Sequence, residues 1–352
     1  MRFRAIGIGA IVVLLMLCLG GVALLQAVGF VTDSIETTPR DQGRASIDDP
    51  DVAALFPTPE SRATFDAISV VQEAGPAVVT VINQQRARGG LMLEAGVGTG
   101  FIVSEQGYIV TNQHVVDGGM SFEVVLADGT KREARLVGED KLSDLAVLQI
   151  EGPVPGTVPL GDSGALQPGQ RVLAIGSALG SFTNTVTRGI VSAVDRDFPG
   201  AGTYTNLVQH DAAINRGNSG GPLLNLAGEV VGVNALGVQR NAYGAPVQGL
   251  FFAVPSNQVR EVAAELITNG RVVYPYLGVA YTPVTAHAIA QLNLHVESGV
   301  ILTGTERGGP ADRAGLRQYD VILAVDGQPV DAENTFIEVL SKFSPGETVT
   351  IT

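Results

Sequence analysis

Short β-type runs separated by glycine turns follow one another through the middle of this chain. These runs are Val78 to Asn83, Gly98 to Val103, Tyr108 to Thr111, Phe122 to Leu126, Glu133 to Gly138, Leu145 to Ile150, Arg171 to Ile175, Thr185 to Ala193, Gly228 to Asn234 and Gly249 to Val254. Turn pairs such as Gln106-Gly107 and Asp128-Gly129 separate them. The abundance of Val, Ala, Gly, Leu and Ile suits many short strands. The pattern predicts a mostly β fold whose hairpins close into barrels.

A helix is expected after this β-rich region, and we place a domain boundary at its end. Pro255-Ser256-Asn257 is a start signal, apolar residues recur at helical spacing, and Asn269-Gly270 ends the pattern. Residues 67–270 therefore form the first predicted domain. Residues 274–352 form a second, with strands predicted at Leu277 to Tyr281, Gly299 to Thr303, Val321 to Val325 and Thr348 to Thr352, and helices at Pro310 to Ala314 and Glu333 to Phe343. Because the chain stops within a strand, we expect this domain to be incomplete at its C-terminus.

The N-terminus carries an apolar stretch from Ala5 to Val31 that only Gln26 interrupts. It exceeds the ~20 residues that cross a bilayer core, and Arg2 and Arg4 precede it. Residues 1–31 are therefore predicted to be a transmembrane anchor whose basic end stays in the cytoplasm, which places the rest of the chain outside it. A cleaved signal peptide remains the alternative, since Gly21-Val22-Ala23 offers a small-x-small site. Residues 32–66 are expected to form a flexible acidic linker.

The charge and cysteine content exclude several function classes. A formal net charge of −13 without a basic stripe argues against nucleic-acid binding. Cys18 is the only cysteine, so no intrachain disulfide and no thiolate metal cluster can form. Gly96 to Gly100 could suggest a phosphate loop, but no Lys-Ser/Thr pair follows it, so we interpret it as part of a hairpin. No metal or other cofactor is expected.

One serine lies inside a glycine cluster, in the run Gly217-Asn218-Ser219-Gly220-Gly221-Pro222-Leu223. Such glycines let backbone N–H groups converge on one point, where two donors can stabilise the oxygen anion formed when a carbonyl is attacked. We expect the amides of Gly217 and Ser219 to be these donors. Because a serine hydroxyl is a poor nucleophile unless a base takes its proton, Ser219 also needs a histidine.

His114, in Thr111-Asn112-Gln113-His114-Val115-Val116, is the best candidate base. His210 competes with it through its nearness to Ser219 and to Asp211. For the acid, Asp144 opens the apolar run Leu145 to Leu148, which suits a carboxylate buried behind the histidine.

Asp211 and Asp140 are the rival acids, and either could be a solvated turn residue. The order His114, Asp144, Ser219 along the chain is one known arrangement of the serine-protease triad.

Several stretches together resemble the HtrA/DegP/DegS family of trypsin-like serine proteases. They are Thr99 to Val103, Gly107 to Val116, Ser143 to Leu148 and Asp211 to Leu223, and they place the likeness over residues 67–270. The segment 274–352 adds resemblance to a PDZ domain, through Tyr276-Leu277-Gly278-Val279 and Gly309 to Leu316.

The resemblance implies a chymotrypsin-like double β-barrel, a His114-Asp144-Ser219 triad and a homotrimer. It implies ATP-independent cleavage of unfolded or signalling proteins outside the cytoplasm, in quality control or the envelope stress response. Ile214 would lie near the pocket for the residue before the cut, which suggests small apolar side chains there. The Arg216-Gly217 turn would be a candidate switch of the oxyanion hole.

In the PDZ-like part, the family pattern implies that amides at Tyr276 to Val279 bind the terminal carboxylate of a peptide and so regulate the protease. The short segment from Asn83 to Gly96, together with the anchor, looks more like the DegS type than the DegP type. Two positions depart from the family: Tyr319 replaces a turn glycine in Gln318-Tyr319-Asp320, and Phe251 stands where a glycine is common beside the substrate. Phe251 is therefore expected to narrow the pocket or change its angle.

Two other functions remain open. The chain could be a peptide-binding chaperone or scaffold whose protease fold rests in an inactive state, with the PDZ-like domain doing the binding. A serine esterase is less favoured, because its serine usually lies in a Gly-x-Ser-x-Gly elbow between a strand and a helix and its chain order is Ser, acid, His. Here no helix pattern follows Ser219, and His114 and Asp144 precede it.

Overall fold

The computed structural model describes residues 33–36, 56, 66–86, 92–178, 182–198, 206–238, 245, 247–332 and 334–352. They divide into two compact units, one within Ala45–Val272 and one that joins Val273–Thr352 to the strand Asp33–Glu36. The predicted anchor at 1–31 and most of the predicted linker lie outside the described residues. Within the described residues no helix combines the length and the apolar character needed to cross a bilayer.

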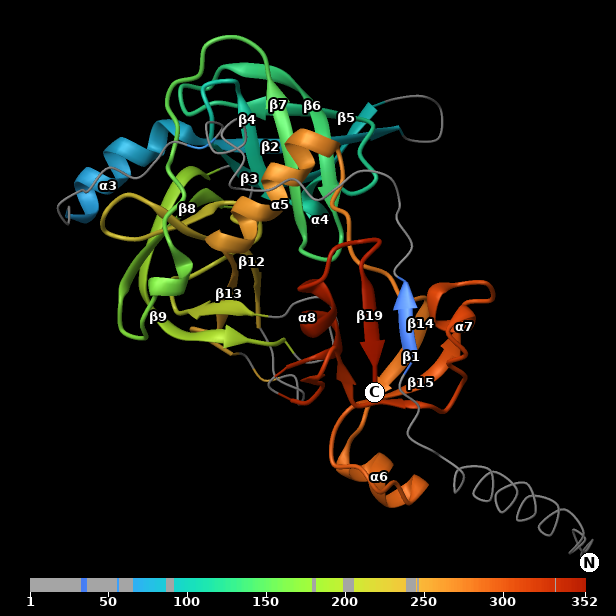
Figure 1. Cartoon of the computed structure of the whole chain (residues 1–352). Helices are drawn as coiled ribbons and strands as arrows, with labels where there is room; N and C mark the ends of the chain where they lie inside the picture. Colours follow the sequence, from blue (N-terminus) through green and yellow to red (C-terminus); the bar gives the residue numbers. More distant parts are fainter. Residues whose placement is uncertain are drawn as a thin grey trace, which may run out of the picture. The chain divides into compact units, whose positions relative to one another are not determined.

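The first half of the larger unit is a closed antiparallel barrel, drawn in teal and green in Figure 1. Its strands run in the order β2-β3-β4-β7-β6-β5. They are β2 (Val78–Arg86), β3 (Met92–Ile102), β4 (Tyr108–Asn112), β5 (Ser121–Val125), β6 (Lys131–Asp140) and β7 (Leu145–Ile150). Gly96 to Gly100 lies within β3, as part of the β2–β3 hairpin.

A second closed barrel follows, with the strand order β10-β13-β12-β11-β8-β9. Its strands are β8 (Arg171–Ala178), β9 (Phe182–Arg196), β10 (Leu207–His210), β11 (Pro222–Leu224), β12 (Val230–Gly237) and β13 (Phe251–Pro255). The expected mostly β double barrel is thereby confirmed. Sequence patterns missed β10 and β11 because such short strands carry too few residues to display alternation.

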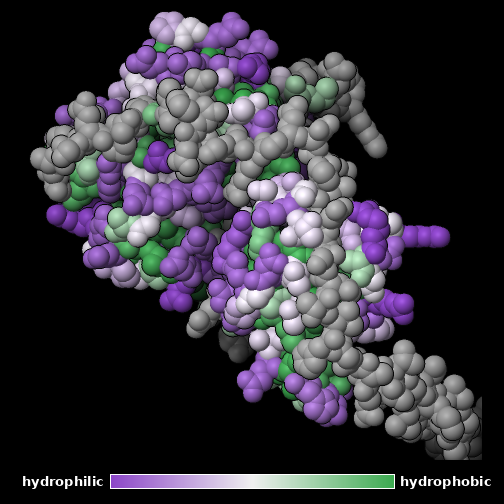
Figure 2. Space-filling view, viewed as in Figure 1, coloured by the Kyte–Doolittle hydropathy of each residue, from purple (hydrophilic) through white to green (hydrophobic). Residues whose placement is uncertain are grey.

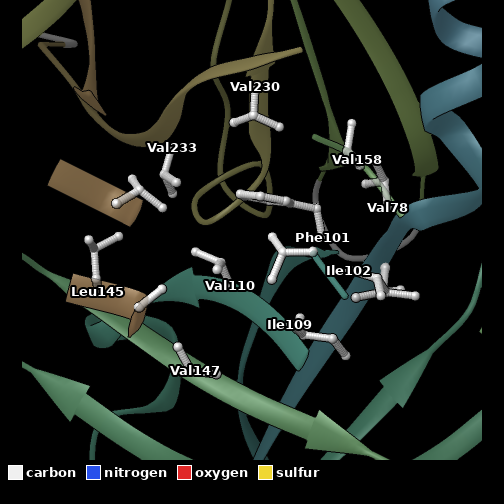
Figure 3. Packing of buried hydrophobic residues seen from close by; sticks show 14 of the residues in the cluster. Val78, Phe101, Ile102, Ile109, Val110, Leu145, Val147, Val158, Val230 and Val233 are labelled. Carbon is white, nitrogen blue, oxygen red and sulfur yellow. The ribbon is translucent and has the colours of Figure 1, made fainter. Parts of the chain in front are cut away.

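Apolar side chains from both barrels form one core in the larger unit. Figure 3 shows Phe101 and Val110 of the first barrel facing Val230 and Val233 of the second. All of them are at most 1% exposed. Because each fully buried apolar side chain contributes about 1.5–3 kcal/mol, this shared core fixes the two barrels against each other.

Three α-helices flank the barrels. They are α3 (Ala67–Ala74), α4 (Gln113–Val116) and α5 (Ser256–Asn269), and short 3-10 turns lie at Gly75–Ala77 and Ser163–Ala165. α3, which the sequence analysis did not expect, is capped by Asp66, whose carboxylate accepts from Ser69 N at 2.8 Å. α5 ends at Gly270, whose φ of 69° suits glycine, so the predicted helix end is confirmed.

The smaller unit contains two sheets and three short helices. One sheet orders β14 (Val279–Pro283), β15 (Val300–Thr305) and β16 (Val321–Ile322). The other orders β1 (Asp33–Glu36), β19 (Thr348–Ile351), β17 (Ala324–Val325) and β18 (Gln328–Pro329). The helices are α6 (Ala286–Leu292), α7 (Pro310–Arg313) and α8 (Phe336–Ser341).

Several features of this unit differ from the sequence-based expectations. The strand predicted at Val321 to Val325 is divided into β16 and β17, which belong to different sheets, and β18 was not expected. β1 pairs antiparallel with β19, so residues 33–36 are not part of a free linker. α6 was not expected. α8 begins at Phe336 rather than at residue 333, because Thr335 and Glu338 form a capping box that fixes the first turn.

Tyr319, which stands where the family pattern has a turn glycine, adopts a backbone conformation that favours glycine. Its φ is +79°, a left-handed conformation that costs a side-chain-bearing residue roughly 1–2 kcal/mol, and the residue is 52% exposed. On the face shown in Figure 2, hydrophilic residues cover most of the coloured surface and apolar residues form small separate patches.

Candidate active site

A histidine and an aspartate from the first barrel are in direct contact. His114 is in α4, and Asp144 immediately precedes β7. His114 Nδ1 lies 2.8 Å from Asp144 Oδ2 and 3.0 Å from Oδ1. The Asp144 side chain is 6% exposed whereas that of His114 is 45% exposed, so a buried carboxylate orients an accessible imidazole.

The backbone around Asp144 fixes this contact. Asp144 has a φ of +54°, which aspartate tolerates better than most residues. Its carbonyl oxygen accepts from Gln113 N at 3.0 Å and from Asn112 Nδ2 at 2.9 Å, and its Oδ1 accepts from His114 N at 3.0 Å. These bonds tie the start of α4 to the start of β7. Asn112 supports the acid, a role that the sequence analysis did not identify.

Ser219 lies in a loop of the second barrel that is held from both sides. Its carbonyl oxygen accepts from Thr99 N of β3 at 2.8 Å, and the next amide, Gly220 N, donates to Asn234 O of β12 at 2.8 Å. Gly220 has a φ of +83°, and a Cβ there would overlap the carbonyl oxygen of Thr99. The glycine after the serine is therefore required for the two barrels to approach each other at the nucleophile.

The serine and the histidine line the same hollow of about 310 Å³. Ser219 Oγ lies 3.4 Å from Ala235 O, and among the described residues no hydrogen bond joins it to His114. Catalytic hydrogen bonds are often long in a protein without substrate and tighten when substrate binds. The structure thus brings all three predicted triad residues to one place, with the Ser219–His114 bond open.

Two backbone amides beside Ser219 are free to stabilise an oxyanion. Gly217 has a φ of +97°, and its carbonyl oxygen accepts from Thr99 Oγ1 at 2.5 Å. Within the described residues, neither Gly217 N nor Ser219 N donates a hydrogen bond. Thr99 Oγ1 also accepts from Ser177 N at 2.8 Å, so this side chain orients the Gly217 peptide. Sequence reasoning missed Thr99, although it opens a stretch that carries the family resemblance.

The two residues predicted to form the substrate pocket lie in the second barrel. Ile214 is 7% exposed and belongs to a small apolar cluster, and Phe251 packs against that cluster. The Phe251 ring also covers Gly237 of β12, where a Cβ would collide with it. Its centroid lies 6.1 Å from that of His210. The Phe251 ring is therefore packed between β10 and β12.

The rival base His210 and the rival acids Asp211 and Asp140 have other environments. His210 is fully buried in β10. Burial lowers the pKa of its imidazole from 6.5 to about 4, against the opposing effect of Asp211. Asp211 Oδ1 accepts from Ile190 N at 2.6 Å, and Asp140 Oδ2 accepts from Ser143 N at 2.9 Å and Ser143 Oγ at 2.6 Å. The contact between His114 and Asp144 therefore supports them over these alternatives.

The buried His210 should make stability depend on pH. The unfolded chain binds a proton near pH 6.5 and the folded chain only near pH 4, so stability is full above about pH 6.5 and falls as the pH drops towards 4. Between pH 7.5 and pH 5 the loss is about 2 kcal/mol. His210→Phe fills the same site with a ring that does not titrate. Over this pH range, we expect its free energy of unfolding, measured in urea, to fall by about 2 kcal/mol less than that of wild type. Parallel pH dependence of the two proteins would contradict this role.

The loop Tyr276–Val279 of the smaller unit has the features of an anion site. Gly278 has a φ of +75°, and within the described residues the amides of Leu277 and Gly278 donate no hydrogen bond. Tyr276 Oη donates to Glu306. β14, which follows this loop, pairs with β15 alone in the described part of the chain, so one of its edges is open. The Tyr281 ring of β14 meets Phe336 of α8 at 4.9 Å, which places α8 beside β14.

Each of the two units is similar to a known protein family. Residues 98–233 match the model of the trypsin-like peptidase domain, and residues 275–352 match that of the PDZ domain. The serine protease Do-like HtrA of Bacillus subtilis is 37% identical over 310 residues, which cover 80% of this chain and 68% of that protein. The chain belongs to the HtrA family of trypsin-like serine proteases. This confirms the family resemblance found in the sequence.

Other HtrA relatives are similar over less of their own length. A probable periplasmic serine endoprotease DegP-like of Brucella suis is 42% identical over 257 residues, which cover 72% of this chain and 49% of that protein. The chain thus spans about half the length of such DegP-like relatives.

Among solved structures, the HtrA-type protease AlgW with a decapeptide matches with a TM-score of 0.70 and 32% identity, covering 81% of this chain and 96% of that one. The serine endoprotease from Yersinia pestis matches with a TM-score of 0.64 at 32% identity, covering 81% of this chain and 96% of that one.

Proposed function

We propose that this chain is an ATP-independent serine endopeptidase that acts outside the cytoplasm on unfolded or regulatory proteins. The contact of His114 Nδ1 with the buried Asp144 carboxylate carries this proposal, because it leaves Nε2 to take the proton of Ser219. The free amides of Gly217 and Ser219 support it, since they can hold the oxyanion. The names of the relatives, which are serine endoproteases and in several cases periplasmic, support the location.

The proposed reaction follows from these groups. Ser219 Oγ attacks the scissile carbonyl while His114 accepts its proton, and the carbonyl oxygen moves between the amides of Gly217 and Ser219. His114 then gives the proton to the leaving amine, and water releases the acyl group from Ser219 by the reverse sequence. Asp144 keeps the imidazole in the tautomer that both proton transfers need.

A comparison of folded and unfolded substrates tests the proposed function. We expect the chain to degrade a reduced, unfolded protein and to leave the native, disulfide-bonded form of the same protein intact. Ser219→Ala is the control, since it removes the nucleophile alone. If the unfolded protein stayed intact with wild type, in the presence of C-terminal peptides as well as without them, the proposal would fail.

We propose further that a peptide C-terminus bound at Tyr276 to Val279 regulates the protease. The free amides at Leu277 and Gly278 and the open edge of β14 support a site for a carboxylate and an extended peptide. The AlgW structures, whose titles name bound peptides, support it by relationship. Titration of a peptide with a free C-terminus against its C-terminal amide would separate carboxylate recognition from unspecific binding.

A peptide-binding chaperone is the second candidate, favoured by the open Ser219–His114 hydrogen bond. In that case Ser219→Ala would restore full function to a deletion strain, whereas a protease would need the serine. Anchoring by residues 1–31 and assembly as a homotrimer also remain proposals. If residues 1–31 anchor the chain, detergent should be needed to extract it from membranes. Light scattering of the extracted protein should then give the mass of three chains.

A further inference from the structure

The hollow beside Ser219 opens on the His114 side of the nucleophile. Its walls come from the first barrel, through Asn83 and Gln85 of β2, Val97 of β3 and Asp117 after α4. Arg216, the residue directly before Gly217, closes it from the second barrel. The hollow is thus a built part of the candidate site, and both barrels contribute to it.

The chemistry assigns this hollow to the leaving part of the substrate. His114 must protonate the leaving amine, so the residues after the scissile bond pass on its side. The pocket for the residue before the bond is instead expected at Ile214 and Phe251, which pack in one apolar cluster of the second barrel. This assignment rests on the proposed protease function.

Arg216 supplies the free charge of the hollow. Its side chain is exposed, and within the described residues it makes no hydrogen bond or ion pair. Asp117, the acid in the same wall, is already bound by Gln113 Nε2 at 2.9 Å and by Lys141 Nζ at 3.1 Å, and these contacts lower its pKa. The unpaired group that faces a substrate here is therefore a guanidinium.

The side-chain amides of Asn83 and Gln85 in the wall already donate hydrogen bonds to backbone carbonyl oxygens. Asn83 Nδ2 donates to Val115 O at 3.0 Å and to Asp117 O at 3.1 Å, and Gln85 Nε2 donates to Asp117 O at 3.2 Å. Arg216 thus remains as the side chain of the wall whose donors are all free. Its planar fork matches a carboxylate, which it can bind through two parallel hydrogen bonds.

We propose that Arg216 makes the enzyme prefer an acidic residue at the second position after the scissile bond. An extended chain advances about 3.3 Å per residue, so this position lies roughly 7 Å from the reacting carbonyl. Arg216 adjoins Gly217, whose amide would hold that carbonyl oxygen, and its long side chain spans such a distance. Arg216 is then a specificity-determining residue of the leaving-group side.

Matched peptides test this role with the full chain. Three quenched fluorescent substrates differ only in Glu, Gln or Lys at the second position after the cut. We expect wild type to cleave the Glu peptide with a kcat/KM about 3- to 10-fold above that of the Lys peptide. This ratio should decrease at high salt, because salt screens the attraction between the charges. Arg216→Lys should keep the preference, Arg216→Gln should lose it, and Arg216→Glu should invert it.

The ratio between peptides is insensitive to a general loss of activity near Gly217. Arg188→Glu makes the same change of charge at an exposed arginine of β9 outside the hollow, and it should leave the ratio unchanged. Cleavage of all three peptides at equal rates by wild type, or an equal shift in Arg188→Glu, would overturn the inference while the protease function stands. No cleavage and no labelling of Ser219 by a fluorophosphonate would overturn the protease function, and the inference with it.

Discussion

Ser219→Ala is expected to lower kcat for peptide hydrolysis by about 10⁵- to 10⁶-fold. The substitution removes the atom that attacks the carbonyl, while both backbone amides of the oxyanion site remain and can still hold an oxyanion, so a small residual rate over water should remain. Steady-state kinetics with an optimised peptide can measure a ratio of this size when wild type is assayed at a much lower enzyme concentration than the variant.

The same variant should fold normally. Ser219 Oγ makes a single long contact, at 3.4 Å to Ala235 O, so the thermal midpoint should stay within about 2 °C of wild type. A normally folded Ser219→Ala protein that kept more than a hundredth of wild-type kcat would show that another residue is the nucleophile.

Asp144→Asn is expected to lower kcat by about 10⁴-fold at neutral pH. Asparagine also tolerates the φ of +54°, and its side-chain oxygen can still accept from His114 N. Its NH₂ group would then face His114 Nδ1 and force that atom to accept. The ring proton would move to Nε2, where the proton of Ser219 has to go.

Asp144→Ala is the matched comparison. It removes the acceptor for His114 N and places alanine in a left-handed conformation, so it should also lower the free energy of unfolding, by about 1–3 kcal/mol. Asp144→Asn should reduce stability less and isolate the effect on the tautomer. If Asp144→Asn lost less than tenfold in kcat, Asp144 would not orient the catalytic base.

The sequence was sufficient to propose the triad because each member lies in a short pattern of its own. Asp144 could be preferred over Asp140 from the apolar run after it, and the structure adds the buried contact with His114. The role of Thr99 could not be predicted in the same way. It depends on a hydrogen bond to Gly217, which is distant in the chain and becomes a neighbour only when the two barrels pack together.

The fold shows the same division between local and long-range information. Longer strands and α5 have clear periodicity or end signals, so their positions could be predicted, although β3 and β9 extend beyond the predicted ranges Gly98 to Val103 and Thr185 to Ala193. β1 could not, because residues 33–36 lie in a polar segment and become a strand only by pairing with β19 at the other end of the chain. The depressed pKa of His210 likewise results from burial between strands, which its neighbours in the sequence do not indicate.

Covalent labelling of the full chain with a fluorophosphonate tests the central claim most directly. Such probes react with a serine whose hydroxyl is activated by a base and whose oxyanion is stabilised. We predict one adduct, mapped by mass spectrometry to Ser219, that is absent in Ser219→Ala and strongly reduced in Asp144→Asn. No adduct in the presence of a C-terminal peptide, or an adduct on a different serine, would contradict the account.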